Sequence, residues 1–271
     1  MAAPNEIAPQ QLLRLIGTPN SPQISDISID PNFSDDPHLI PGTFRHPQTD
    51  LPGLTTRLNG KPSIITCQKG ITLSQGIAAQ LRSAGLRSKY QSGGNYGWRD
   101  LTQAPRISSA NLPQMDQGHS LWVTRHWPKI DRIACPWRIR RFADNDARFL
   151  FVSPTKVIGV SDRYNAIPFD IEDIFCSHRG DSSTFDTMLD EFGLRTPALD
   201  RLSTAVRATD TDNHDLAPEA AGLLALSVCL SRQYRDDLEQ LEAVMHSYDA
   251  VYRWARDGTA ERHTWPTGKP P

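Results

Sequence analysis

The sequence of 271 residues lacks the run of about 18 apolar residues that a membrane-spanning helix needs. Its first six residues, Met1 to Glu6, contain neither a basic segment nor an apolar run, so we expect no signal peptide. Excess charge of either sign is also missing, because 29 Lys and Arg oppose 31 Asp and Glu and the pI is about 6.4. This balance argues against a general nucleic-acid or acidic-membrane binder. We therefore expect a cytoplasmic protein without a nucleic-acid or membrane partner.

Cysteine is scarce. The four cysteines, at positions 67, 135, 176 and 229, form no Cys-x-x-Cys pair and no regular framework. Their pattern excludes a disulfide scaffold and suits a reducing compartment. Internal repeats and extended low-complexity tracts are missing as well. With 38% hydrophobic residues, the chain is long enough for two domains that each have a core.

One cysteine stands where an apolar run ends and a helix is expected to begin. Residues 63–66, Ser-Ile-Ile-Thr, predict a short buried strand. Thr72 and Gln75 have the spacing of a capping box, which would start the helix at Leu73 and leave residues 67–72 as a loop. Apolar residues then recur at helical spacing: Leu73, Ile77 and Leu81. Cys67 is therefore predicted at a strand-to-helix turn.

A loop of this kind can hold an anion beside the sulfur of Cys67. Its backbone N–H groups point inward, and the helix N-terminus adds roughly half a positive charge. A thiol in such a place, near a cation such as Lys69, ionises readily, and the same donors would stabilise a persulfide. The alternative is a buried, unreactive cysteine, the commoner fate of a lone cysteine. The strand, the capping box and Lys69 favour Cys67 as a nucleophile, with residues Gln68, Lys69, Gly70, Ile71 and Thr72 around the substrate.

Residues 67–72, Cys-Gln-Lys-Gly-Ile-Thr, resemble the active-site loop of the rhodanese family. The lysine, glycine and threonine match its thiosulfate sulfurtransferase variety. Gln68 departs from the arginine that is usual there, and an amide grips a dianion such as thiosulfate less firmly than a guanidinium does.

Three further segments extend this resemblance over about ninety residues. Residues 24–27 stand where rhodaneses have their first strand and its aspartate, here Asp26, which we expect to be structural. Residues 38–43, His-Leu-Ile-Pro-Gly-Thr, resemble the His-Ile-Pro-Gly-Ala turn, and Gly93-Gly94 with Trp98 resembles the end of the domain. The resemblance implies sulfur transfer through Cys67 from a small sulfane-sulfur donor to a thiol or cyanide.

The alternation of strands and helices predicts an α/β domain with a small, mainly parallel sheet over residues 1–105. Residues 18–62 are rich in Pro, Asp, Asn and Ser, and we interpret them as loops around one strand near Ile24. Residues 106–118 have little apolar periodicity and are expected to form a linker, and residues 258–271 a tail.

A second, helix-rich α+β domain is expected over residues 119–257. Its strand patterns lie at 121–125, 147–152 and 168–171, and its helix patterns at 182–192, 197–208, 218–230 and 237–255.

Five arginines, one lysine and three tryptophans lie between positions 122 and 142. They can form a buried tryptophan and isoleucine face with solvated arginines opposite, which is the usual structure of such a run. They can instead form an oxyanion pocket, for which Arg132, Arg140 and Arg141 are the candidates, since arginine binds tetrahedral dianions bidentately. Nucleic-acid contact is the least favoured interpretation, given the acidic chain.

The acidic turn at residues 210–215, Asp-Thr-Asp-Asn-His-Asp, is a candidate metal site. An EF-hand alignment fails, because Asp215 takes the glycine position and Ala221 the bidentate glutamate position. A divalent transition metal bound by His178, Asp210, Asp212 and Glu219 is the remaining hypothesis. The alternative is capping of the next helix by these acidic residues.

Four segments of the second domain resemble the C-terminal domain of the chromate resistance family ChrB: residues 122–125, 129–137, 210–212 and 216–224. In regulatory members that domain follows a DNA-binding domain, whose place the rhodanese-like domain takes here. The resemblance therefore implies a response to chromate or another oxyanion and not DNA binding.

Together these patterns predict a sulfurtransferase with a Cys67 persulfide, linked to chromate resistance. A chromate-binding or redox-sensing protein without sulfur turnover is the alternative. A phosphatase or arsenate reductase of the related fold ranks last, because those families carry a longer loop, usually with a closing arginine, and the resemblance fails in both respects here.

Overall fold

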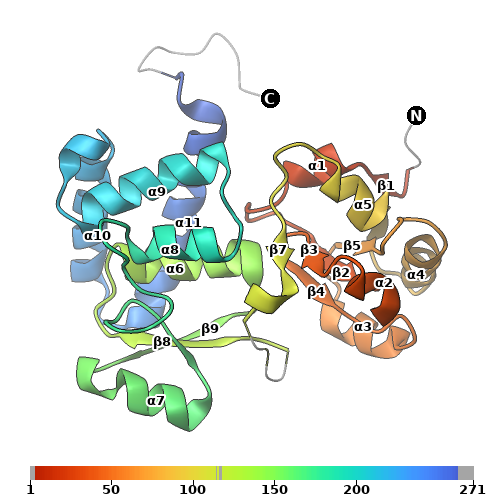
Figure 1. The fold of residues 1–271 in the computed structure, drawn as a ribbon, viewed down its shortest axis with the longest axis horizontal. Helices are drawn as coiled ribbons and strands as arrows, with labels where there is room; N and C mark the ends of the chain where they lie inside the picture. Colours follow the sequence, from red (N-terminus) through yellow and green to blue (C-terminus); the bar gives the residue numbers. More distant parts are fainter. Residues whose placement is uncertain (1–3, 114, 116–117, 262–271) are drawn as a thin grey trace.

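The computed structural model describes residues 4–113, 115 and 118–261, which form two halves joined side by side (Figure 1). The first half is built on a five-stranded sheet of order β1-β6-β5-β2-β4 in which every neighbouring pair is parallel. Its strands are β1 (Glu6–Ile7), β2 (Gln23–Asp26), β4 (Thr43–Arg45), β5 (Ser63–Thr66) and β6 (Ser88–Gln91). The predicted parallel sheet is confirmed, and β5 lies at its centre.

Five helices accompany this sheet: α1 (Pro9–Leu13), α2 (Asp30–Ser34), α3 (Leu51–Leu58), α4 (Thr72–Ser83) and α5 (Gly94–Arg99). Successive residues of β5 point to opposite faces. Ile65 packs in a cluster with apolar residues of α3 and α4. Ile64 belongs to the large core, which also contains Leu12 of α1 and Trp98 of α5. Both faces of β5 are thus buried, which explains its unbroken apolar sequence.

Residues 18–62 contain more regular structure than the single strand that their composition predicts. The loop interpretation is wrong for α2, α3, β4 and the short strand β3 (His38–Leu39). Pro52 lies in the first turn of α3, where the missing N–H costs nothing. The carboxylate of Asp50 caps this helix by accepting the Gly53 N–H at 2.9 Å.

Part of the segment between the two halves forms regular structure. Strand β7 (Ile107–Ser108) pairs antiparallel with β3, and a 3-10 turn follows at Ser109–Asn111. Figure 1 shows β7 where the two halves meet. Ile107 is 1% exposed and belongs to the large core. This segment therefore ties the halves together through apolar contacts.

The second half has a three-stranded parallel sheet of order β10-β8-β9, with β8 (Leu121–Arg125), β9 (Arg148–Val152) and β10 (Ile167–Pro168). Its helices are α6 (Asp131–Arg138), α7 (Val157–Tyr164), α8 (Thr184–Glu191), α9 (Pro197–Asp210), α10 (Ala220–Gln233) and α11 (Asp237–Arg253). Turns of π-helix extend α6 over Ile139–Ala143 and α11 over Trp254–Gly258, and 3-10 turns lie at Pro154–Lys156 and His214–Leu216. The predicted helix-rich architecture is confirmed.

One hydrophobic core runs through both halves. It contains residues of the first sheet, such as Ile24, and the tryptophans 122 and 137 of the second half, which are 1% and 0% exposed. At the junction, the Gly42 N–H donates to the Phe142 carbonyl oxygen at 2.5 Å. In the part of the chain that the structure describes, no helix combines the length and the apolar character needed to cross a membrane.

Candidate functional site

Cys67 directly follows β5, the central strand of the first sheet, and lies at the carboxyl edge where ligands bind in parallel α/β sheets. The cysteine is 4% exposed. Its sulfur lies 3.4 Å from the hydroxyl oxygen of Ser74, in the first turn of α4. The predicted strand-to-helix position of the cysteine is thus confirmed.

The loop after Cys67 is held against α5 by its carbonyl groups. The Asn95 N–H donates to the Cys67 carbonyl at 3.0 Å, and the Tyr96 N–H donates to the Gln68 carbonyl at 3.1 Å. A trans peptide directs a carbonyl and the N–H that follows it to opposite sides. The amides that follow these carbonyls therefore point away from α5. Among the described residues, no acceptor is found for the N–H groups of residues 68–71.

The capping box predicted at the start of α4 is wrong. The helix begins at Thr72 itself, and its N-cap residue is Ile71, without a side-chain cap. Gln75 instead directs its amide to the carbonyl of Gly70, at 3.5 Å. Thr72 already lies in the first helical turn, so its hydroxyl cannot take the role of an N-cap. The N-terminus of α4 is consequently left with unsatisfied N–H groups beside the cysteine loop.

The remaining residues of the loop differ in exposure. Gln68 is 9% exposed, and its side chain donates to the carbonyl of Asn32 in α2 at 3.1 Å. Lys69, Ile71 and Thr72 are exposed to solvent. Lys69 can therefore approach an anion from outside, whereas Gln68 closes the loop against α2.

Asp26 is fully buried beside the loop and is engaged on both oxygens. One accepts the Ser28 N–H at 2.7 Å, and the other accepts the side-chain amide of Asn95 at 3.1 Å. Asn95 also accepts the hydroxyl of Thr66, at 3.1 Å. These contacts fix the end of β5 relative to α5.

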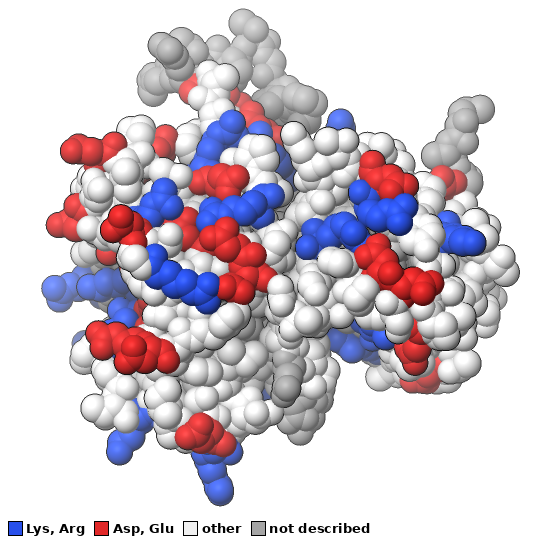
Figure 2. All heavy atoms as spheres, viewed as in Figure 1, with Lys and Arg blue, Asp and Glu red and all other residues white. Residues whose placement is uncertain are grey.

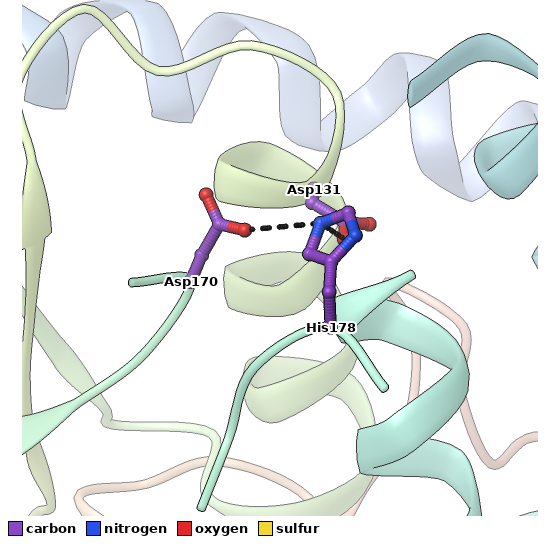
Figure 3. A group of neighbouring side chains, drawn as sticks. All are labelled: Asp131, Asp170 and His178. Atoms are coloured by element: carbon purple, nitrogen blue, oxygen red, sulfur yellow. Dashed lines mark ion pairs between the residues drawn. The ribbon is translucent and has the colours of Figure 1, made fainter. Parts of the chain in front are cut away.

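A second polar cluster lies in the other half, where Asp131, Asp170 and His178 point toward one another (Figure 3). Asp131 is the first residue of α6, Asp170 follows β10, and His178 lies between β10 and α8. The His178 Nε2 atom is 3.3 Å from Asp131 Oδ2 and 3.5 Å from Asp170 Oδ1. A third carboxylate, Asp210 at the end of α9, lies 3.2 Å from the same nitrogen.

Neighbouring groups hold the two buried carboxylates in place. The N–H of Thr184 donates to Asp131 Oδ2 at 2.5 Å, and its hydroxyl donates to Asp170 Oδ1 at 2.9 Å. The other oxygen of Asp170 faces Arg125 at 3.2 Å and Arg132 at 3.3 Å. Asp131 is 1% exposed and Asp170 is 6% exposed.

The close packing of these charges shifts their pKa values. Burial, reinforced by Asp210 and Asp170, raises the pKa of Asp131 to about 7. Hydrogen bonding to Asp131, and then to Asp170 and Asp210, raises the pKa of His178 to about 12. Burial alone would raise the pKa of Asp170, but His178, Thr184 and two arginines lower it. The cluster therefore places one imidazole among three carboxylates.

Each of the three oxyanion candidates faces a carboxylate, and the three do not all line one cavity. The pairs are Arg132 with Asp170, Arg140 with Glu242, and Arg141 with Asp249.

Two of these candidates nevertheless line the same surface pocket. Arg140 and Arg141 border a cavity of about 400 Å³, together with Arg148 and His246. Over the face shown in Figure 2, basic and acidic side chains are interspersed on both halves of the molecule. Asp146 and Glu242 also line the pocket, so the charge of its arginines is partly offset.

Comparison with known proteins finds a resemblance in the second half of the chain. Residues 122–255 match the family model described as ChrB, C-terminal domain. Over these residues the chain resembles the ChrB C-terminal domain. A curated relative, Protein ChrB of Cupriavidus metallidurans, is 30% identical over 169 residues, which cover 57% of this chain and 50% of the relative. The chain thus spans about half the length of that relative. This ChrB-like half of the chain contains the cluster around His178 and the pocket at Arg140.

The solved structures that match the chain cover about a third of it. A rhodanese-like domain protein from Staphylococcus aureus is 23% identical, covers 36% of this chain and 94% of its own, and has a TM-score of 0.32. Thiosulfate sulfurtransferase from Pseudomonas aeruginosa is 21% identical over 38% of this chain and 19% of its own, with a TM-score of 0.32. The N-terminal region thus has rhodanese-like structural neighbours.

The structure brings together only two of the four predicted metal ligands, His178 and Asp210 of the set that also included Asp212 and Glu219. The side chain of Asp212 is 93% exposed and faces His214 at 3.5 Å, and Glu219 is the N-cap residue of α10. Sequence reasoning missed Asp131 and Asp170. Asp131 stands inside the ChrB-like segment 129–137, which was the one signal that could have found it.

Proposed function

We propose that the chain transfers sulfane sulfur through a persulfide on Cys67 and that this activity serves chromate resistance in the cytoplasm. The observation that carries the proposal is the run of four N–H groups, residues 68–71, for which the described residues offer no acceptor. They follow Cys67 at the carboxyl edge of the sheet, beside the uncapped start of α4. Free amides and a helix N-terminus stabilise an anion.

The first step forms a bond between the Cys67 sulfur and the outer sulfur of the donor. With thiosulfate, the thiolate attacks that sulfur, the sulfur–sulfur bond of the donor breaks, and sulfite leaves with the electron pair. The product is a persulfide anion on Cys67. The free amides of the loop stabilise its terminal sulfur, and Lys69 adds a positive charge from the solvent side.

The second step returns the thiolate. Cyanide or an acceptor thiolate attacks the terminal sulfur, the persulfide bond breaks, and the Cys67 sulfur keeps the electron pair. The products are thiocyanate or a new persulfide on the acceptor. Gln68 stands where an arginine is usual, and its amide binds a dianion less firmly than a guanidinium does. A monoanionic persulfide donor therefore suits this loop better than thiosulfate.

Turnover with thiosulfate or glutathione persulfide as donor and cyanide as acceptor tests the proposal, with thiocyanate as the measured product. Wild type is compared with Cys67→Ser and with Cys229→Ser, a matched change at an exposed cysteine. We expect Cys67→Ser to lose turnover and Cys229→Ser to retain it. Full turnover in Cys67→Ser would rule the proposal out.

The pocket at Arg140 supports a second candidate, in which the ChrB C-terminal domain binds chromate and Cys67 only senses oxidation. Two of the predicted oxyanion ligands border this one cavity with Arg148 and His246. Arginine side chains can donate charge-assisted hydrogen bonds to a tetrahedral dianion, which would compete here with Glu242 and Asp146 in the same lining. If the wild type shows no sulfur turnover, we titrate it with chromate in a calorimeter. Heat of binding would then favour this second function over the first.

A further inference from the structure

We propose that Asp131, Asp170 and His178 bind a divalent first-row transition metal ion, with Asp210 as a neighbouring carboxylate. This site is separate from the cysteine loop and from the arginine pocket, and neither sulfur transfer nor oxyanion binding requires it.

The geometry of the cluster is that of ligands around a cation. A metal with bonds of about 2.1 Å to nitrogen and oxygen separates its neighbouring ligand atoms by roughly 3.0–3.4 Å in octahedral or tetrahedral coordination. The His178 nitrogen lies 3.3 Å and 3.5 Å from the facing oxygens of Asp131 and Asp170. One N–H cannot point at both oxygens and also at Asp210, 3.2 Å away. A cation at the centre can contact the facing atoms of Asp131, Asp170 and His178, which all lie within 4.8 Å of one another.

Asp131 provides an independent reason. Its carboxylate is 1% exposed, and among the described residues no lysine or arginine pairs with it, so His178 is its one cationic neighbour. The one charge that His178 can carry is shared among Asp131, Asp170 and Asp210, so Asp131 has no full countercharge of its own. Asp170 differs, because Arg125 and Arg132 face its outer oxygen.

The surroundings orient both carboxylates from outside, as metal sites require. Thr184 contacts each of them, through its N–H to Asp131 and through its hydroxyl to Asp170. The arginines occupy Asp170 Oδ2, which leaves Oδ1 directed toward His178. The ligand atoms all lie within 4.8 Å of one another.

The donor set selects the class of metal. Two carboxylate oxygens and one imidazole nitrogen suit Mn²⁺, Fe²⁺ or Zn²⁺, whereas Ca²⁺ and Mg²⁺ favour oxygen alone and Cu⁺ favours sulfur. Three protein ligands leave positions open for Asp210 or water. We therefore expect one such ion per chain.

Metal-free full-length protein, prepared with a chelator and desalted, is titrated with Mn²⁺ while electron paramagnetic resonance counts the free ion. A parallel titration with Zn²⁺ uses a chromophoric chelator as competitor. We expect one bound ion per chain, with pulsed resonance of bound Mn²⁺ showing coupling to an imidazole nitrogen. A wild type that binds neither ion at one per chain would overturn the proposal.

Two histidine variants separate the site from general surface binding. His178→Ala should lower the affinity at least about tenfold and remove the nitrogen coupling, because it deletes a ligand. His214→Ala is the matched control, since its side chain is 36% exposed against 38% for His178 and also faces an aspartate. Circular dichroism checks that both fold, and Asp170→Asn is the second ligand variant. Equal affinity and retained coupling in His178→Ala would contradict the assignment.

Discussion

A β-carbon on Gly70 would lie 2.3 Å from the amide nitrogen of Gly94, so the cysteine loop and the start of α5 touch through backbone alone. Both glycines have positive φ, at 67° and 57°. A side chain at either position would be strained and would also clash with backbone. This contact brings the Cys-Gln-Lys-Gly segment and the Gly-Gly pair, two dozen residues apart, into one site.

Replacing Gly70 by alanine should therefore damage the loop. We expect a loss of about 1–3 kcal/mol in the free energy of unfolding and at least about a tenfold drop in sulfur transfer, because the loop must move away from α5. Urea denaturation and thiocyanate assays measure the two effects. Gly76→Ala, in α4 with open space around the new methyl group, is the control and should be neutral or stabilising. Matching behaviour of the two variants would show that the contact is unimportant.

Asp249 should be critical for stability. It is 8% exposed and accepts hydrogen bonds from Trp137 at 2.8 Å and from Arg141 at 2.7 and 2.9 Å. Asp249→Asn should lower the free energy of unfolding by about 2–4 kcal/mol, since Arg141 loses its buried, negatively charged partner. Glu242→Gln should lower the free energy of unfolding by less than about 1 kcal/mol, because the Glu242 side chain is 63% exposed and its ion pair with Arg140 is screened by water. Equal midpoints of urea denaturation for the two variants would refute this ranking.

This dependence on Asp249 decides which arginines can test oxyanion binding. Removing Arg141 would take away the arginine that pairs with Asp249. Arg140 and the exposed Arg148 also line the pocket, and replacing them leaves that pair intact. If the pocket binds chromate, Arg140→Ala and Arg148→Ala should each weaken the affinity about tenfold by removing a charge-assisted contact. Arg163→Ala, at an exposed position on α7, is the control for calorimetric titration. Titration heats that are unchanged in both pocket variants would exclude the pocket.

Local patterns were sufficient for the elements that carry the cysteine. The apolar run at 63–66 predicted β5 with its observed bounds, because burial of both faces leaves no polar alternation to confuse it. The start of α4 was predicted one residue too late, at Leu73 instead of Thr72, since the sequence of a capping box does not show whether its threonine is extended or helical. Helix α3 was missed because its first turn has the composition of a loop.

The second half was less accessible to such reasoning, because its functional groups meet through tertiary packing. Asp131 and Asp170 are 39 positions apart, and no periodicity relates them. Arg138 shows the same limit. The sequence favoured solvated arginines, yet this side chain is fully buried, with its guanidinium 4.4 Å from the ring centre of Phe192. Burial lowers the pKa of Arg138 to about 10.

Intact mass after incubation with a sulfur donor tests the central claim most directly. Wild type and Cys67→Ser are each exposed to thiosulfate and to glutathione persulfide, and desalted before measurement. Wild type should gain the mass of one sulfur atom, about 32 Da, and Cys67→Ser should gain none although its other three cysteines remain. A wild type that takes sulfur from neither donor, or a variant that takes as much as wild type, would contradict a Cys67 persulfide.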